Sequence, residues 1–300
     1  MGAKGGEGKR LDSRFRMSLP ERFVKMAGGG NDFLLFEADG RKLTDADGRR
    51  IALVCRRGLS VGADGALFLS GGGDGRIHLD YFNADGGLAS FCANGTRCAA
   101  RYAVTRRLVA DPELVLETGW GHIGARVEGE QVTLALREVL APTEPISLDL
   151  ENSARFATAG LPPTGIPIHV GVPHLVVFLR GDLAALPIDK VGPPLRRHAL
   201  LPEGANVNFV RIAGPNRLEV RTWERGVEAE TLSCGSGVVA SALVALQRGH
   251  VETPVVCGTK SGVDLVVDGR LERDVFTDVT LTGDAREVFR AELTEEAWKE

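Results

Sequence analysis

Cys92-Ala93-Asn94-Gly95 and Cys234-Gly235-Ser236-Gly237 are two short turns of small residues, and each precedes a stretch of apolar or small residues. The two cysteines are 142 positions apart, and the same number separates Asp64 from Asn206, each of which follows a Gly-Ala pair. This period is far longer than the roughly 20 to 50 residues of solenoid repeats. The sequence therefore predicts two homologous domains, each with a cysteine at an equivalent point.

The composition favours a small molecule as the binding partner. A chain of 300 residues is long enough for two ordinary domains with buried cores. The net charge of -4 and the absence of basic tracts argue against nucleic acid or an anionic membrane surface as a partner. No apolar run approaches the ~20 residues that a membrane helix requires. The odd number of 5 cysteines, without the spacing of a disulfide framework, favours a reducing cytoplasm.

Short strands dominate the predicted secondary structure. Apolar and polar residues alternate at Ile77–Tyr81 and at Leu218–Thr222, as in half-buried strands. Further short strands are expected at residues 132–136, 168–172, 175–178 and 263–267.

Few helices are predicted, and two of them occupy equivalent places in the two halves. Residues 238–246 are apolar or small on all sides and end at Gly249, which predicts a buried helix. Residues 98–104 predict a similar helix in the first half. A third helix is expected after Thr44, where Asp47 completes a variant of the capping box.

These patterns predict an α/β protein of two homologous domains, each with strands wrapped around a central helix. Residues 1–20 are polar and rich in glycine, which predicts a disordered extension. The first domain is expected at 21–141 and the second at 142–274, joined by the proline-containing linker 142–145. A C-terminal strand within 275–300 could return to the first domain.

A cysteine at the N-terminus of a helix has a specific chemistry. The helix dipole and the unpaired N–H groups lower the pKa of the thiol and bind anions. If two such helix ends face each other, one thiolate can remove the hydrogen of a substrate α-carbon while the other thiol protonates the opposite face. N–H groups aimed at the substrate carboxylate stabilise the charge that develops. The ligand spacings of zinc sites are absent, and a cysteine protease would leave the second cysteine unexplained.

Several separated motifs between Arg22 and Glu292 resemble those of one known family. They are Gly29–Phe33, Asn83–Gly86, Cys92–Gly95 with Arg97-Cys98, Pro173-His174, Asn206-Val207, Glu224–Gly226, Glu230-Thr231, Cys234–Gly237, and Leu281–Gly283 with Val288-Phe289. The family is that of the diaminopimelate epimerases, cofactor-independent amino-acid epimerases of lysine and cell-wall biosynthesis. The resemblance implies two similar α/β domains with the substrate in the cleft between them. It also implies epimerisation of LL- to meso-diaminopimelate without pyridoxal phosphate or metal.

The resemblance also implies roles for individual residues. Cys92 and Cys234 would be the acid and base, and His174 and Glu224 would adjust their pKa values. Backbone groups would hold the reacting carboxylate at Ala93, Asn94, Gly235 and Ser236. The far amino-acid end would be bound by Asn31, Asn83, Asn206, Glu224 and Arg225, and Gly65 would contribute its backbone at most. A homodimer is the expected assembly.

Three departures from the family pattern leave a second enzyme open. Ala93 replaces the usual glycine, Val172 replaces an asparagine before Pro173-His174, and the loop from Glu224 to Cys234 is one residue longer. Val172 favours a related racemase for proline, hydroxyproline or histidine, whereas the polar pair Glu224-Arg225 favours diaminopimelate. A non-catalytic binding protein, or a phenazine-type isomerase without the cysteine pair, would not require both thiols.

Overall fold

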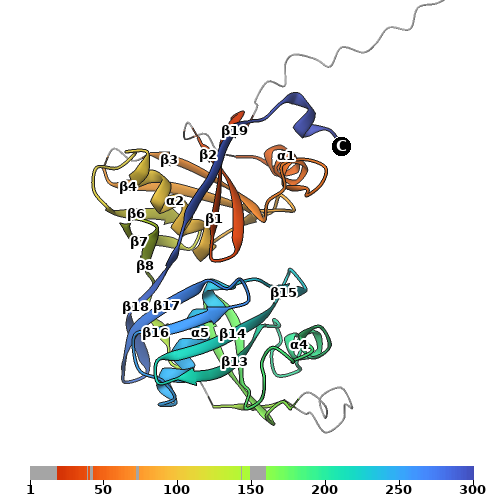
Figure 1. Ribbon diagram of the computed structural model, residues 1–300, viewed down its shortest axis with the longest axis vertical. Coiled ribbons are helices and arrows are strands. Elements are labelled where there is room, and N and C mark those ends of the chain that lie inside the picture. The colour runs from red at the N-terminus through yellow and green to blue at the C-terminus, as the bar shows by residue number, and fades with distance from the viewer. Residues whose placement is uncertain (1–18, 39, 41–42, 72–73, 143, 149–159) are drawn as a thin grey trace, which may run out of the picture.

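The computed structural model describes residues 19–38, 40, 43–71, 74–142, 144–148 and 160–300. Two strand-rich domains lie one above the other along the long axis of the molecule (Figure 1). Most of the predicted N-terminal extension at 1–20 lies outside the described residues. Within the described ranges, no helix is long and apolar enough to cross a membrane.

Among the residues that the structure describes, the first domain contains eleven elements in chain order. They are β1 (Arg22–Gly28), β2 (Asn31–Glu37), α1 (Asp45–Cys55), β3 (Gly65–Gly71), β4 (Arg76–Asn83), β5 (Leu88–Ala89), α2 (Ala93–Thr105), β6 (Glu113–Thr118), β7 (Gly121–Glu128), β8 (Gln131–Ala135) and β9 (Val139–Leu140). Strand β2 pairs in parallel with β3, and β4 pairs in parallel with β6. Helix α2 packs against β1, β2, β4, β7 and β8, so it lies at the centre of these strands.

The second domain repeats this order. It contains β10 (Ile146–Ser147), β11 (Thr164–Val170), β12 (Val172–Phe178), α4 (Ile188–Arg196), β13 (Asn206–Gly214), β14 (Arg217–Glu224), β15 (Ala229–Thr231), α5 (Gly235–Gln247), β16 (Val255–Thr259), β17 (Asp264–Glu272) and β18 (Val275–Asp284). The parallel pairs recur as β12 with β13 and β14 with β16, and α5 is the central helix. The predicted fold of two homologous domains, each wrapped around one helix, is confirmed.

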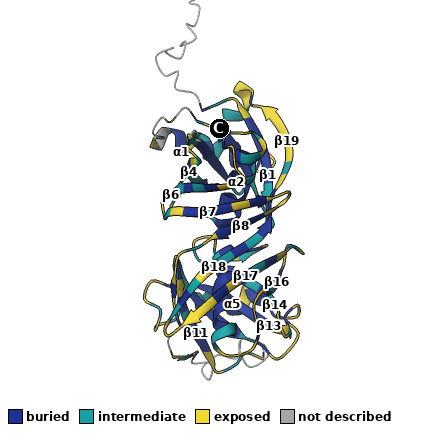
Figure 2. Cartoon of the chain, turned by 90° about the vertical axis from the view of Figure 1, so that its left-hand side faces the viewer, coloured by how far each residue is buried: buried dark blue, intermediate teal, exposed yellow. Residues whose placement is uncertain are grey.

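Strand β18 connects the two domains. It pairs with β17 of the second domain and with β8 of the first. The chain then continues into β19 (Arg286–Glu292), which pairs with β1, and ends after the 3-10 helix η3 (Glu295–Trp298). In Figure 2, β19 is a largely exposed strand on the outer edge of the first domain, whereas α2 and α5 are mostly buried.

The central helices contain many small residues, which pack closely against the surrounding strands. In α2, Ala99, Ala100 and Ala103 have no exposed surface. In α5, nearly every residue from Gly235 to Ala245 is buried. Both helices begin earlier than predicted, at Ala93 and Gly235, which makes Cys92 and Cys234 the N-cap residues. The helix predicted after Thr44 is α1, with the expected capping box.

One predicted strand was wrong in detail, and one helix was not predicted. The strand expected at 168–172 ends at Val170, because Gly171 adopts a positive φ of 72° and Val172 begins the antiparallel β12. Helix α4 was not predicted, because two prolines inside it indicate a helix break. It forms because Ile188, Val191 and Leu195 place one apolar face in the second core.

Candidate active site

The N-termini of the two central helices meet between the domains. A methyl group placed on Gly235 would lie 2.8 Å from the Cβ atom of Ala93, which is closer than two carbon atoms pack. Glycine at position 235 therefore permits the approach of α5 to α2. Since Cys92 and Cys234 directly precede these two residues, the fold brings both thiols to one place.

Both cysteines line a cavity of about 580 Å³. Eight other predicted site residues also line it, namely Asn31, Asn83, Ala93, Asn94, Glu224, Arg225, Gly235 and Ser236. Asn31 to Asn94 come from the first domain and Glu224 to Ser236 from the second. A larger groove of about 810 Å³ lies over β1, β19 and the end of α2, and its described lining contains none of the predicted site residues.

The electrostatic setting of the thiols differs from the expectation of a lowered pKa. Burial raises the pKa of Cys92 to about 11, and the backbone N–H groups of Gly95 and Asn94 offset only part of this effect. Burial also raises the pKa of Cys234, and the Ser236 hydroxyl, 3.6 Å from its sulfur, acts in the opposite direction. The expectation was wrong because desolvation of a buried thiolate outweighs the helix N–H groups.

Glu224 affects both thiols. Its negative charge raises the pKa of Cys92 and that of Cys234. Burial raises the pKa of Glu224 itself, and the charge of Asp64 across the cavity adds to this effect. The carboxylate of Glu224 comes from the end of β14, directly before Arg225.

His174 is buried behind the cavity wall. Its side chain is 1 % exposed, and Nδ1 lies 3.1 Å from Nδ2 of Asn208. The Thr222 hydroxyl donates to Oδ1 of Asn208, so the Asn208 amide donates to Nδ1 and the proton of His174 is on Nε2. Burial lowers the pKa of His174 to about 3, so the ring is neutral at physiological pH.

Two other predicted residues also lie outside the described cavity lining. The backbone N–H of Arg225 donates to Oδ1 of Asn206 over 2.7 Å, so Asn206 holds the chain beside the cavity. Gly65 begins β3 and pairs with β4 in the same sheet, where a side chain would collide with the Phe82 carbonyl and with Tyr81. Val172, the unusual residue of the sequence, is half-buried at the start of β12 and is not part of this lining either.

Sequence reasoning missed several residues of the cavity wall. Tyr81 lines the cavity together with Cys92, and burial and the negative charge of a Cys92 thiolate both raise the pKa of the phenol. The sequence could have indicated Tyr81, because the alternation of residues along β4 places it on the same face as Leu79 and Asn83. Asp64, Asp85, Phe91, Thr231 and Ser233 also line the cavity. Over the described part of the chain, no group of three or more His, Cys, Asp or Glu could hold a metal ion.

A family model matches both domains of the chain. The model described as diaminopimelate epimerase matches residues 23–138 and 167–282, one segment in each domain. The chain belongs to the diaminopimelate epimerase family.

Relatives within this family match most of the chain. The diaminopimelate epimerase of Methanothrix thermoacetophila is 37% identical over 256 residues, which cover 80% of this chain and 86% of that protein. The diaminopimelate epimerase of Gemmatimonas aurantiaca is 37% identical and covers 90% of this chain and 98% of its own. A crystal structure described as a probable proline racemase from Agrobacterium radiobacter K84 has the same fold, with a TM-score of 0.66. It shares 15% identity, and the match covers 91% of this chain and 93% of that one.

Proposed function

We propose that this protein interconverts LL- and meso-2,6-diaminopimelate by two-base proton transfer between Cys92 and Cys234. The observation that supports the mechanism most directly is that both cysteines, from two domains, line one cavity at opposed helix N-termini. The thiolate of one cysteine takes the α-proton, and the thiol of the other delivers its proton to the opposite face. The centre is inverted, and no cofactor is needed because the protein supplies acid and base.

The carbanion formed in this reaction needs stabilisation of its carboxylate. The first N–H groups of α2 and α5 have no partner within their helices, and they lie at the same end of the cavity as the thiols. In our proposal, N–H groups at Ala93, Asn94, Gly235 and Ser236 bind the carboxylate of the reacting carbon. Such donors in a buried site favour the charge that develops there.

The raised pKa values of the two thiols support a site in which a thiolate forms only after the substrate has entered. At neutral pH both thiols are protonated in the empty cavity, because burial disfavours the thiolate. The ammonium group of an amino acid brings a positive charge beside the sulfur atoms and favours loss of one proton. Glu224 is placed to accept this ammonium group, and His174, being neutral, does not compete with it.

Arg225 and Asn83 also line the cavity and are the proposed contacts of the far amino-acid end. A second candidate, a racemase for proline, hydroxyproline or histidine, is favoured in the sequence by Val172, whose side chain cannot hydrogen-bond a substrate, but Val172 is not part of the described cavity lining. In diaminopimelate the far carboxylate would pair with the Arg225 guanidinium, whereas none of the alternative substrates has a second carboxylate. The polar lining therefore favours diaminopimelate.

The test is exchange of the α-hydrogen in deuterium oxide with the reduced protein. We expect turnover of LL-diaminopimelate to exceed that of proline, hydroxyproline and histidine. Arg225→Ala should lower kcat/KM for diaminopimelate at least about tenfold, which corresponds to ~1.4 kcal/mol. Faster racemisation of proline, hydroxyproline or histidine would exclude diaminopimelate as the main substrate while leaving the two-thiol chemistry in place.

We also propose that the protein works as a cytoplasmic homodimer in the synthesis of lysine and peptidoglycan precursors. A reducing compartment would keep all five cysteines as free thiols, which is their state in the structure. Analytical ultracentrifugation of the purified protein measures the assembly, and a monomer at micromolar concentration would contradict the dimer.

A further inference from the structure

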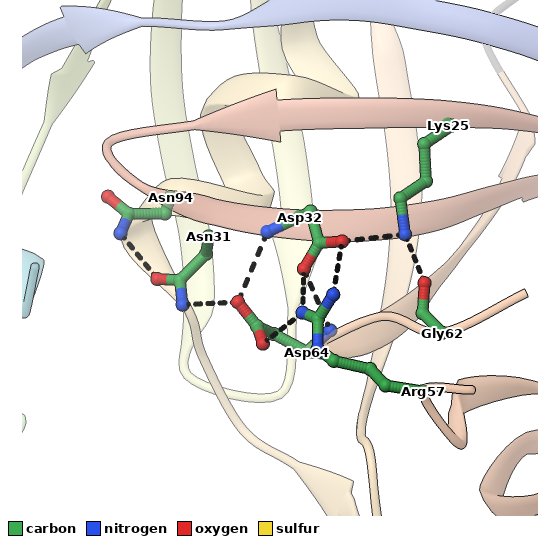
Figure 3. Close-up of polar contacts among 7 residues, drawn as sticks. All are labelled: Lys25, Asn31, Asp32, Arg57, Gly62, Asp64 and Asn94. Carbon is green, nitrogen blue, oxygen red and sulfur yellow. Dashed lines mark hydrogen bonds and ion pairs between the residues drawn. The ribbon is translucent and has the colours of Figure 1, made fainter. Parts of the chain in front are cut away.

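A continuous chain of hydrogen bonds runs along the wall that the first domain contributes to the cavity. Nδ2 of Asn94, in the first turn of α2, donates to Oδ1 of Asn31 over 2.7 Å. Nδ2 of Asn31 in turn donates to Oδ2 of Asp64 over 2.9 Å. Figure 3 shows these side chains in line, from the N-terminus of α2 to the loop before β3. All three residues line the cavity beside Cys92.

Charged groups hold both ends of this chain. At one end, Nη2 of Arg97, a residue with no exposed surface, donates to Oδ1 of Asn94 over 2.7 Å. At the other end, Arg57 donates to Oδ1 of Asp64 over 2.7 Å and also binds Asp32. These contacts fix the position of the Asp64 carboxylate.

Contacts of Asp32 also help to hold Arg57 and Asp64 in place. Lys25 lies 2.7 Å from Asp32, and the backbone N–H of Asp32 donates to Oδ2 of Asp64 (Figure 3). Burial raises the pKa of Asp32, but hydrogen bonds from Arg57 and Lys25 outweigh this effect and hold it below the ordinary value. Asp32 therefore stays ionised and keeps Arg57 in place.

The chemistry of the two ends determines the orientation of both amides. A guanidinium can only donate, so Asn94 must turn its oxygen to Arg97 and its NH2 group to Asn31. An ionised carboxylate can only accept, so Asn31 must turn its NH2 group to Asp64. Each amide nitrogen carries a second hydrogen that none of these bonds uses. Each amide oxygen already accepts one of these bonds, so the unused hydrogens of both amides are held in a fixed direction.

We infer that Arg97 and Asp64 are positioning residues that lock Asn31 and Asn94 with N–H donors toward the substrate. The amide hydrogens of this wall then favour a carboxylate over a carboxamide NH2, whereas Glu224 on the opposite wall takes the ammonium group. The inference rests on the proposed function for the substrate class, an amino acid. In this inference, Arg97 and Asp64 determine which hydrogen-bonding groups the wall offers to the substrate, although neither residue contacts the reacting atoms.

The test compares the double variant Asp64→Asn/Arg97→Gln with the unmodified protein in binding of diaminopimelate and of its monocarboxamide, measured by calorimetry. An asparagine at position 64 and a glutamine at position 97 can each donate or accept, so both amides of the chain are free to reverse. We expect the preference for the acid over the carboxamide to fall about tenfold, the effect of one charge-assisted hydrogen bond. Asp74→Asn is the matched control, because Asp74 also receives a backbone N–H and lies near an arginine, away from the cavity. Its preference should equal that of the unmodified protein.

Variants that keep one end of the chain provide the control. Each single variant, Asp64→Asn or Arg97→Gln, retains one group that can only donate or only accept, so it should keep most of the preference. The double variant Asp64→Asn/Arg97→Lys likewise retains a group that only donates, so the preference should be kept. Equal weakening of acid and carboxamide binding in the folded Asp64→Asn/Arg97→Gln protein would overturn the inference. Absence of diaminopimelate exchange by the unmodified protein would instead contradict the proposed function.

Discussion

Substitution of Gly235 by alanine tests whether the contact between the two helix ends sets the distance between the thiols. The new methyl carbon would lie 2.8 Å from the Cβ atom of Ala93, whereas carbon atoms pack at about 3.5 to 4.0 Å. The next neighbour, the tip of Leu281 at 3.4 Å, can move. The helix ends must therefore separate by about 1 Å. Gly235 is the first residue of α5 and has no positive φ, so alanine itself suits the backbone.

A separation of this size has a predictable effect on rate. Misplacement of reacting groups by ~1 Å can lower a rate by about 100-fold. This factor corresponds to ~2.7 kcal/mol in the barrier of the reaction. We therefore expect kcat/KM of Gly235→Ala to fall about 100-fold in the α-hydrogen exchange assay, while the protein remains folded in thermal unfolding experiments.

A second substitution, at Ala93, tests whether the contact with residue 235 causes the loss of activity. Ala93→Gly removes the methyl group that Gly235→Ala would meet, so the double variant should recover to within about threefold of the unmodified protein, as expected for two residues in contact. Ala93→Gly alone should be close to unmodified. Full activity in Gly235→Ala, or a double variant no better than Gly235→Ala, would show that this contact does not set the thiol geometry.

Three other predictions concern the thiols and their surroundings. Replacement of Cys92 or Cys234 by alanine should abolish inversion, and Cys98→Ala should retain it; near-normal epimerisation without either Cys92 or Cys234 would end the two-base mechanism. Because Glu224 raises the pKa of both thiols, Glu224→Gln should shift the rising limb of the kcat/KM–pH profile to lower pH, and an unmoved limb would contradict this role. His174 binds its proton at about pH 3 when folded but near pH 6.5 when unfolded, so the unfolded chain gains the proton first as pH falls. Its contribution to stability should fall by about 1.4 kcal/mol per pH unit below pH 6.5, and His174→Gln should lose this dependence in denaturant unfolding at pH 7 and 4.5.

The sequence by itself predicted the duplication and the two cysteines at helix N-termini. These features are local or periodic, because a recurring spacing and an apolar stretch after a small turn are visible without any tertiary contact. The same holds for the alternation of β4 and for the capping box at Thr44. Helix α4 was not predicted, because its two prolines are a local signal against a helix. Burial of its apolar face, a tertiary effect, outweighs that signal.

Only the tertiary structure decided which predicted residues share the cavity and how they are charged. His174 and Asn206 are far from Cys92 in sequence, and whether they contact substrate or support the wall depends on packing between strands. The pKa values of the thiols depend on burial, which raised them where the helix position alone predicted a decrease. The chain from Arg97 to Asp64 was likewise invisible in sequence, because hydrogen bonds between distant side chains follow from the fold and not from local spacing.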